Sequence, residues 1–258
     1  MIEHYLKPDT TAQAIELMQQ HLGAATYFAG GSKLNAAPTK TEKTVAISLT
    51  NLALDKIEQQ GEALHIGAMC RLQTMIDSEL IPVALKQAAG FIYSRHVRNQ
   101  ATIGGEIAAV QDEALLLPSL IALKAKLELA ESGEMDIEEY IASDKRGLIT
   151  KVIIPNVNLM CLGYNITRSA AGLSIVTAAV SVAKNGEKII ALEGVAPTPV
   201  RLRDVESQDL KGELLEQAVA DAIYPEADIR GSVEYKRYIA GVVVTDLLAE
   251  CQHLAEEA

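Results

Sequence analysis

The chain contains few cysteines, few aromatic residues and no long hydrophobic run. Its three cysteines stand far apart in 258 residues, which suits reduced thiols and falls short of the four thiolates that an iron–sulfur cluster usually needs. No stretch of eighteen apolar residues could cross a membrane, and residues 1–7 lack the basic start and apolar core of a signal peptide. We therefore expect a cytoplasmic protein without a membrane anchor or a cluster of its own.

Basic residues are also scarce. The 23 Lys and Arg are outnumbered by 34 Asp and Glu, which gives a net charge of -11. Trp is absent, Phe occurs twice, and no group of Lys or Arg interleaves with aromatic residues. The sequence therefore lacks the basic surface and the stacking platform that nucleic-acid binding needs, and no nucleic-acid partner is expected.

Common catalytic signatures are missing as well. There is no G-x-G-x-x-G, no P-loop, no His-Glu-x-x-His and no nucleophile elbow, and the five histidines are dispersed. The neighbouring carboxylates Asp112-Glu113 and Glu138-Glu139 are expected on solvated helix faces. The sequence thus predicts no metal site and no catalytic residue, as in a protein that leaves the chemistry to a bound redox cofactor.

Two glycine pairs carry the strongest positive signal. Ala29-Gly30-Gly31-Ser32-Lys33-Leu34 follows a short apolar run, and Ala101-Thr102-Ile103-Gly104-Gly105-Glu106-Ile107 enters another. Glycine pairs at such junctions allow positive φ and a close approach of backbone N–H groups to an anion. Two loops of this kind predict a site for the two halves of a pyrophosphate.

Hydrophobic periodicity predicts an α+β protein in three units, 1–55, 56–155 and 156–258. The first unit has strands near 2–6, 26–28 and 44–49, with a helix after Pro8 that ends at Gly23. The second has strands near 63–66, 126–130 and 148–154, and helices near 72–78, 82–89 and 114–123. The third has antiparallel strands near 159–167, 175–183 and 188–194, then helices near 214–223 and 232–255.

The chain resembles the FAD-binding (medium) subunits of molybdenum hydroxylases, of the xanthine dehydrogenase and carbon monoxide dehydrogenase type. The most specific block is Val97-Arg98-Asn99-Gln100-Ala101-Thr102-Ile103-Gly104-Gly105. Further blocks lie at residues 5–8, 29–34, 66–68, 194–201 and 228–237, in the same order along the chain. The resemblance implies two small N-terminal α/β subdomains that form a vanillyl-alcohol-oxidase-like (PCMH-type) FAD-binding domain, covered by a C-terminal α+β domain.

The resemblance also implies which residues hold FAD. The first glycine loop would wrap the pyrophosphate, the second would meet it from the other subdomain, and Ile149 and Tyr164 would lie near the cofactor. The cofactor-binding residues implied are Ala29, Gly30, Gly31, Ser32, Lys33, Leu34, Ala101, Thr102, Gly104, Gly105, Glu106, Ile149 and Tyr164.

Four positions depart from the family pattern. Glu106 stands where the family often has Asn, and Leu115 where it commonly has Asp at the adenosine part. Tyr164 and Gly172 replace a polar residue, often Lys, and an Asp near the flavin ring. A carboxylate beside a pyrophosphate is unfavourable by about 1 kcal/mol or more at a few Å. Lys33 and Arg98 could offset this repulsion if they point inward.

The function implied by the resemblance is an electron-transfer subunit of a molybdenum-dependent hydroxylase that oxidises a purine or another N-heterocycle. Electrons would arrive from iron–sulfur clusters on a partner, beside a molybdopterin-binding subunit, and leave to NAD or another acceptor. The chain alone would be inactive on the organic substrate. Two alternatives remain, namely a flavin-free structural or assembly subunit and a free-standing flavin reductase.

Overall fold

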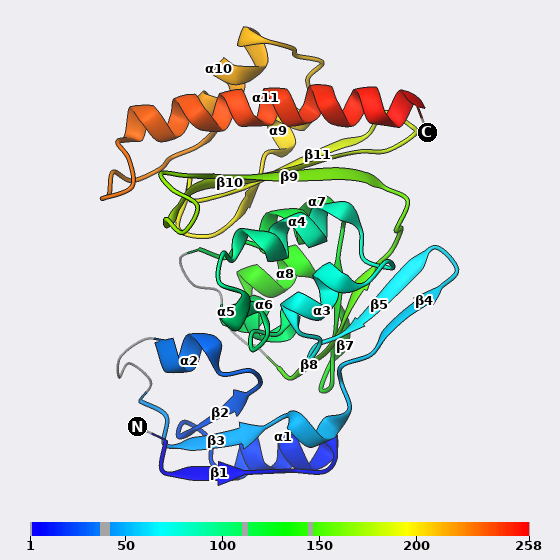
Figure 1. The fold of residues 1–258 in the computed structure, drawn as a ribbon, viewed down its shortest axis with the longest axis vertical. Helices are drawn as coiled ribbons and strands as arrows, with labels where there is room; N and C mark the ends of the chain where they lie inside the picture. The colour runs from blue at the N-terminus through cyan, green and yellow to red at the C-terminus, as the bar shows by residue number, and fades with distance from the viewer. Residues whose placement is uncertain (1, 37–41, 110–112, 144–146, 258) are drawn as a thin grey trace.

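Three β-sheets, formed by successive stretches of the sequence, divide the structure into three parts (Figure 1). The computed structural model describes residues 2–36, 42–109, 113–143 and 147–257. In Figure 1 the N-terminal part lies at the bottom, the second part in the middle, and the C-terminal sheet with its long helix at the top. We propose the predicted boundaries near residues 55 and 156, which fall between the sheets, as the division of the chain.

The first part is a parallel sheet in the order β1-β3-β2 with a helix packed on it. Its strands are β1 (His4–Leu6), β2 (Ala25–Phe28) and β3 (Val45–Ser48), and its helices are α1 (Thr11–Gln20), α2 (Ser32–Ala36) and the 3-10 turn η1 (Thr50–Leu52). Thr10 caps α1 because its hydroxyl accepts a 3.2 Å bond from the Gln13 amide. Leu148, from the second part, is buried in the core of this first part and so joins the two.

The second part is an antiparallel five-stranded sheet with helices against it. Its strands are β4 (Ile57–Gln60), β5 (Ala63–Gly67), β6 (Lys126–Leu129), β7 (Gly133–Asp136) and β8 (Ile149–Ile154), in the order β4-β5-β8-β6-β7. Its helices are α3 (Leu72–Asp77), α4 (Val83–Phe91), α5 (Arg95–Arg98), α6 (Ile103–Ala109), α7 (Leu117–Ala122) and α8 (Ile137–Ala142).

The third part is a sheet covered on both faces by helices (Figure 1). Its strands are β9 (Met160–Thr167), β10 (Ser174–Val182), β11 (Lys188–Glu193) and β12 (Val200–Arg201), and its helices are α9 (Arg203–Glu206), α10 (Glu213–Ala222) and α11 (Val233–Glu257). Helices α4 and α7 of the second part pack on one face, and α11 packs on the other. Every residue of β10 is therefore buried, which explains its unbroken run of small and β-branched residues.

Polar contacts fasten the third part to the second. The Ser181 hydroxyl donates a buried 2.7 Å bond to the Ala122 carbonyl, and the Gly163 amide donates to the Gln87 side chain. Glu138 of α8 pairs with Arg203 at 2.8 Å, so this carboxylate is held by a partner rather than simply solvated. These bonds add direction to the apolar packing between the two parts.

The predicted helix face at Asp112-Glu113 is wrong for Glu113, while Asp112 lies outside the described residues. Glu113 has a left-handed backbone, with φ of 72°, and belongs to no helix. Its carboxylate accepts a 3.0 Å bond from the Ser174 amide, and its own amide donates to Glu193 at 3.1 Å. The residue is therefore a link between the second and third parts.

No helix in the described part of the chain is both long and apolar enough to span a membrane.

Two glycines in helix interiors give a matched test of this packing. A methyl group at Gly241 of α11 would lie 2.6 Å from the Glu216 carbonyl of α10, whereas one at Gly90 of α4 meets nothing within 4 Å. We expect Gly241→Ala to lower the free energy of unfolding by about 1–3 kcal/mol. Gly90→Ala should raise it by about 0.5–1 kcal/mol, because alanine favours the helix. Urea denaturation followed by circular dichroism measures both, and equal effects would contradict the close α10–α11 packing.

Candidate functional site

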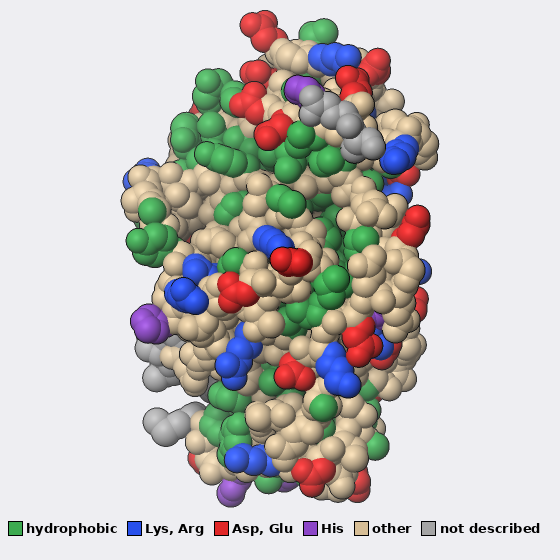
Figure 2. Space-filling view, turned by 45° about the vertical axis from the view of Figure 1, so that its right-hand side comes forward, with side chains coloured by type: hydrophobic (Ala, Val, Ile, Leu, Met, Phe, Trp, Pro, Cys, Tyr) green, Lys and Arg blue, Asp and Glu red, His purple; other side chains and the backbone are tan. Residues whose placement is uncertain are grey.

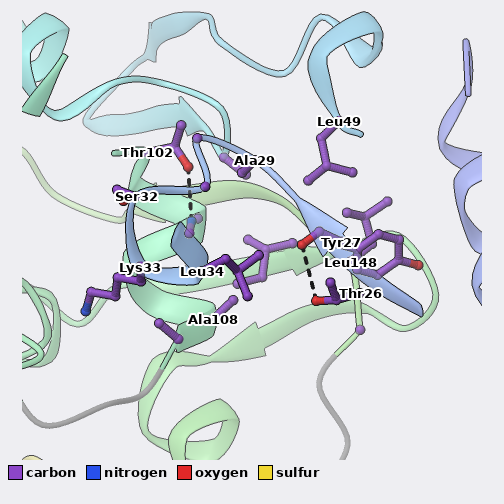
Figure 3. Close-up of a pocket in the computed structure, with 18 residues that line it drawn as sticks. Thr26, Tyr27, Ala29, Ser32, Lys33, Leu34, Leu49, Thr102, Ala108 and Leu148 are labelled. Carbon is purple, nitrogen blue, oxygen red and sulfur yellow. Dashed lines mark hydrogen bonds between the residues drawn. The ribbon is translucent and has the colours of Figure 1, made fainter. Parts of the chain in front are cut away.

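A cavity of about 290 Å³ lies between the first and second parts, where the two glycine loops meet (Figure 3). It is lined by Thr26, Tyr27, Ala29, Gly30, Gly31, Ser32, Lys33, Leu34, Leu49, Ala68, Thr102, Gly104, Gly105, Ala108, Ala109, Gly147, Leu148 and Ile149. The site is therefore shared between parts of the chain that are far apart in sequence.

The first glycine loop turns the chain from β2 into α2. Gly31 has a φ of 70°, a left-handed conformation that glycine adopts at little cost, and it also packs against the Phe28 ring. The first paired amide of this segment is that of Asn35, which donates to the Gly31 carbonyl at 2.9 Å. Among the residues that the structure describes, no hydrogen bond engages the amides of residues 30–34. Within the described part of the chain, this loop therefore has a row of donors without partners beside the cavity.

The second glycine loop is built differently. Its amides are already paired, since Gly104 donates to the Ala68 carbonyl at 2.9 Å and Gly105 to the Thr102 hydroxyl at 3.2 Å. A methyl group at Gly104 would lie 2.7 Å from the Ala68 side chain, so glycine here permits close packing. The expectation that both loops aim amides at an anion is wrong for Gly104 and Gly105 of the second loop, and for the first loop it stays a prediction. At Gly104 and Gly105 the second loop presents only backbone to the cavity, and Thr102 of the same loop adds its hydroxyl group.

The two loops touch each other at Gly30. A methyl group there would lie 1.8 Å from the carbonyl oxygen of Gln100, which no rearrangement of a side chain could relieve. The expected reasons for these glycines were positive φ and a close approach to an anion, and among the four only Gly31 has positive φ. Gly30 is required instead because the backbone of the second loop occupies the space that a side chain would take.

Lys33 and Glu106 form an ion pair across the junction of the loops. The Lys33 Nζ lies 3.0 Å from the Glu106 carboxylate, whose residue is 5% exposed. Burial raises the pKa of Glu106, and the charge of Lys33 opposes this shift. The Nζ atom is itself buried and has no well-aligned hydrogen-bond acceptor among the described residues. In Figure 3, Lys33 and Leu34 leave α2 in opposite directions.

Arg98, the other candidate to balance Glu106, has a structural role. Its guanidinium donates to the Gln73 side chain at 2.9 Å and to the Ile92 and Tyr93 carbonyls at 2.7 and 2.9 Å. These bonds hold the turn between α4 and α5. Lys33 is therefore the cation that pairs with the Glu106 carboxylate in this structure.

The opposite end of the cavity is apolar, with Leu49, Leu148 and the Tyr27 ring as walls (Figure 3). The Tyr27 hydroxyl donates to Glu131 at 3.4 Å, and the other Glu131 oxygen accepts from the Leu148 amide at 2.8 Å. Burial, followed by the charge of Glu131, raises the pKa of Tyr27. This end suits a flat ring system rather than a charged group.

The structure brings most of the predicted site residues together. The cavity is lined by residues 29–34, Thr102, Gly104, Gly105 and Ile149. Ala101 and Glu106 are buried and do not line it, and Glu106 pairs with Lys33. Tyr164, on β9, is 54% exposed and outside the cavity, so its contact with a cofactor stays a prediction. Sequence reasoning missed Thr26, Tyr27, Leu49, Ala68, Ala108, Ala109, Gly147 and Leu148. Thr26, Tyr27, Ala108 and Ala109 carried a signal as neighbours of the glycine loops, and Ala68 lies in the family block at 66–68.

Outside this cavity, the described residues contain no group of three or more metal-binding side chains close enough to hold an ion. Figure 2 shows acidic and basic side chains intermixed on one face of the molecule.

Comparisons with known proteins agree with this geometry. Residues 1–157 match the family described as "FAD binding domain in molybdopterin dehydrogenase", and residues 165–251 match "CO dehydrogenase flavoprotein C-terminal domain". The chain is 53% identical over 258 residues, 100% of both proteins, to "Uncharacterized protein YgfM" of Escherichia coli (strain K12).

Two further likenesses concern carbon monoxide dehydrogenase. The chain is 26% identical over 272 aligned positions to the carbon monoxide dehydrogenase medium chain of Hydrogenophaga pseudoflava, covering 93% of each. A solved carbon monoxide dehydrogenase from the same organism, lacking the Mo-pyranopterin moiety, superposes with a TM-score of 0.87 at 24% identity, covering 98% of both chains, which shows a shared fold. The chain therefore belongs to the family of FAD-binding subunits of molybdenum hydroxylases.

Proposed function

We propose that this chain holds FAD between its two glycine loops and carries electrons for a molybdenum-dependent hydroxylase. The single observation that supports this most directly is the cavity, which is lined by a first loop whose amides at residues 30–34 have no partner among the described residues and by the Gly104-Gly105 pair of the second loop. Backbone N–H groups arranged in this way bind phosphate oxygens well, because they bring partial positive charge without bulk.

The residues present fit FAD. The amides of residues 30–34, the Thr102 hydroxyl and the buried Lys33 ammonium would hold the pyrophosphate. The apolar end at Tyr27, Leu49 and Leu148 would take a flat part of the cofactor. When bound, FAD supplies one- and two-electron redox chemistry, and the chain's own part is to bind and orient the cofactor and to exclude water.

The partners, the electron acceptor and the substrate belong to the same proposal. An iron–sulfur subunit would deliver electrons and a molybdopterin-binding subunit would oxidise a purine or another N-heterocycle, with NAD as an acceptor. The similarity to a protein named as the medium chain of a carbon monoxide dehydrogenase supports a role within such an assembly. The cytoplasmic location expected from the sequence is part of this proposal.

A flavin-free structural subunit is the second candidate, and two observations favour it. Glu106 places a buried carboxylate close to the loops that would meet a pyrophosphate. Leu115, where the family commonly has Asp, is packed into the core of the second part and offers no polar contact. The Lys33–Glu106 pair weighs against this candidate, because it neutralises the carboxylate.

Replacement of Gly30 tests the loop assignment. Because a methyl group there would collide with the Gln100 carbonyl, Gly30→Ala must push the two loops apart. We expect the affinity for FAD to fall about ten- to a hundredfold, the equivalent of about 1–3 kcal/mol. Gly90→Ala, which meets nothing within 4 Å, is the matched control and should bind as the wild type does. Titration followed by flavin fluorescence measures both, and full affinity in Gly30→Ala would show that the loops do not hold the cofactor.

Replacement of Lys33 tests its role as a phosphate partner. Loss of a charge-assisted hydrogen bond in Lys33→Met should weaken FAD binding about ten- to a hundredfold. The effect should be larger at low salt, because dissolved ions weaken the attraction between the ammonium group and the negatively charged pyrophosphate. Lys33→Arg retains the charge and serves as the control. Equal affinity of Lys33→Met and the wild type at low salt would place the ammonium outside the site.

We expect the isolated chain not to oxidise N-heterocyclic substrates, because its three cysteines are too few for an iron–sulfur cluster and the described residues place no three metal-binding side chains together. It should still pass electrons slowly from NADH to artificial dyes once FAD is bound, since the flavin chemistry is the cofactor's own. Assays of the purified chain with and without the partner subunits measure this. Hydroxylation by the chain alone, shown to be free of molybdenum and iron, would contradict the proposal.

A further inference from the structure

Glu106 is the one buried carboxylate beside the proposed pyrophosphate loops in the described part of the chain. It follows Gly104-Gly105 directly, in the first turn of α6, and is 5% exposed. Its amide is bonded to the Thr102 carbonyl at 2.9 Å, so its backbone is fixed to the loop. The side chain does not itself line the cavity, but its backbone directly follows the glycine pair that does, so a negative charge on it would repel an anion bound at the loops.

A single cation faces this carboxylate among the described residues. From α2, the Lys33 Nζ lies 3.0 Å away. From β8, Lys151 turns instead to Glu128 at 2.9 Å, and Arg71, whose backbone is bridged to Thr102, is exposed. No histidine lines the cavity. One ammonium can balance one carboxylate, but it cannot also balance a pyrophosphate that carries two negative charges.

Burial favours the neutral form of Glu106 and raises its pKa, while the charge of Lys33 opposes this shift. A pyrophosphate at the loops would compete for the Lys33 ammonium and add repulsion. Both effects favour protonation of the carboxylate, and the protonated carboxyl group could then donate a hydrogen bond.

We propose that Glu106 takes up a proton when FAD binds, so that this residue makes the affinity of the site for FAD depend on pH. The inference rests on the proposed function, namely that the two loops hold the FAD pyrophosphate. The proton comes from solvent and adds to a carboxylate oxygen of Glu106. Affinity then falls as pH rises, by up to about tenfold per pH unit for one proton. The phosphates, adenine and flavin of FAD do not themselves titrate between pH 6 and 8.

Isothermal titration calorimetry of FAD into the flavin-free full chain at pH 6, 7 and 8 tests the proposal. Each pH is measured in two buffers with different heats of ionisation, so that the number of protons taken up is read directly. Glu106→Gln removes the titrating group and keeps its shape, with Glu106→Asn as a second variant if the first does not fold. Glu128→Gln, which removes the carboxylate of the Lys151 ion pair, is the matched control.

The wild type and Glu128→Gln should take up a fraction of a proton, up to about one, with affinity falling as pH rises. Glu106→Gln should take up none and should bind at pH 8 more tightly than the wild type, even if the wild type binds there too weakly to measure. Binding by the wild type without proton uptake, or the same uptake in Glu106→Gln, would overturn the inference while leaving the FAD site intact. Failure of the wild type and the Glu106 variants to bind FAD at any of the three pH values would instead overturn the proposed function.

Discussion

The close approach of two backbone segments at Gly30 constrains the rest of the site. The Gln100 carbonyl occupies the place of a side chain at this position, so the loop after β2 and the loop before α6 must lie against each other. Because the loops belong to different sheets, their contact fixes how the first part of the chain docks on the second. The cavity, its unpaired amides and the Lys33–Glu106 pair all depend on this junction.

The remaining architecture supports this junction from both sides. Leu148 is buried in the core of the first part, and Tyr27 reaches across to Glu131. On the other side, α4 and α7 are fixed under the C-terminal sheet, where Ser181 and Gly163 bond to the second part. The second part is thus held between two neighbours. These contacts on both sides give the loop at residues 101–106 a defined place.

Periodicity and turn residues predicted the long elements well, because they bury a regular face. The strands at β8, β9, β10 and β11 and the helix α11 begin and end within a few residues of the predicted ranges. Short elements such as α2, α5 and α6 were missed, because tertiary contacts stabilise them more than local propensity does. The glycine pairs located the cavity, but their separate roles depend on the neighbours of each residue in space. The sequence contained no sign that Leu49 and Leu148 would both line the apolar end of the cavity.

The central claim is that FAD lies between the two glycine loops, with the amides of residues 30–34 as phosphate donors. Hydrogen exchange read by mass spectrometry, with and without saturating FAD, tests this most directly. The account predicts slower exchange at residues 30–34 together with protection around residues 102–106 at the facing loop. Unchanged exchange at residues 30–34 in protein saturated with FAD would contradict it.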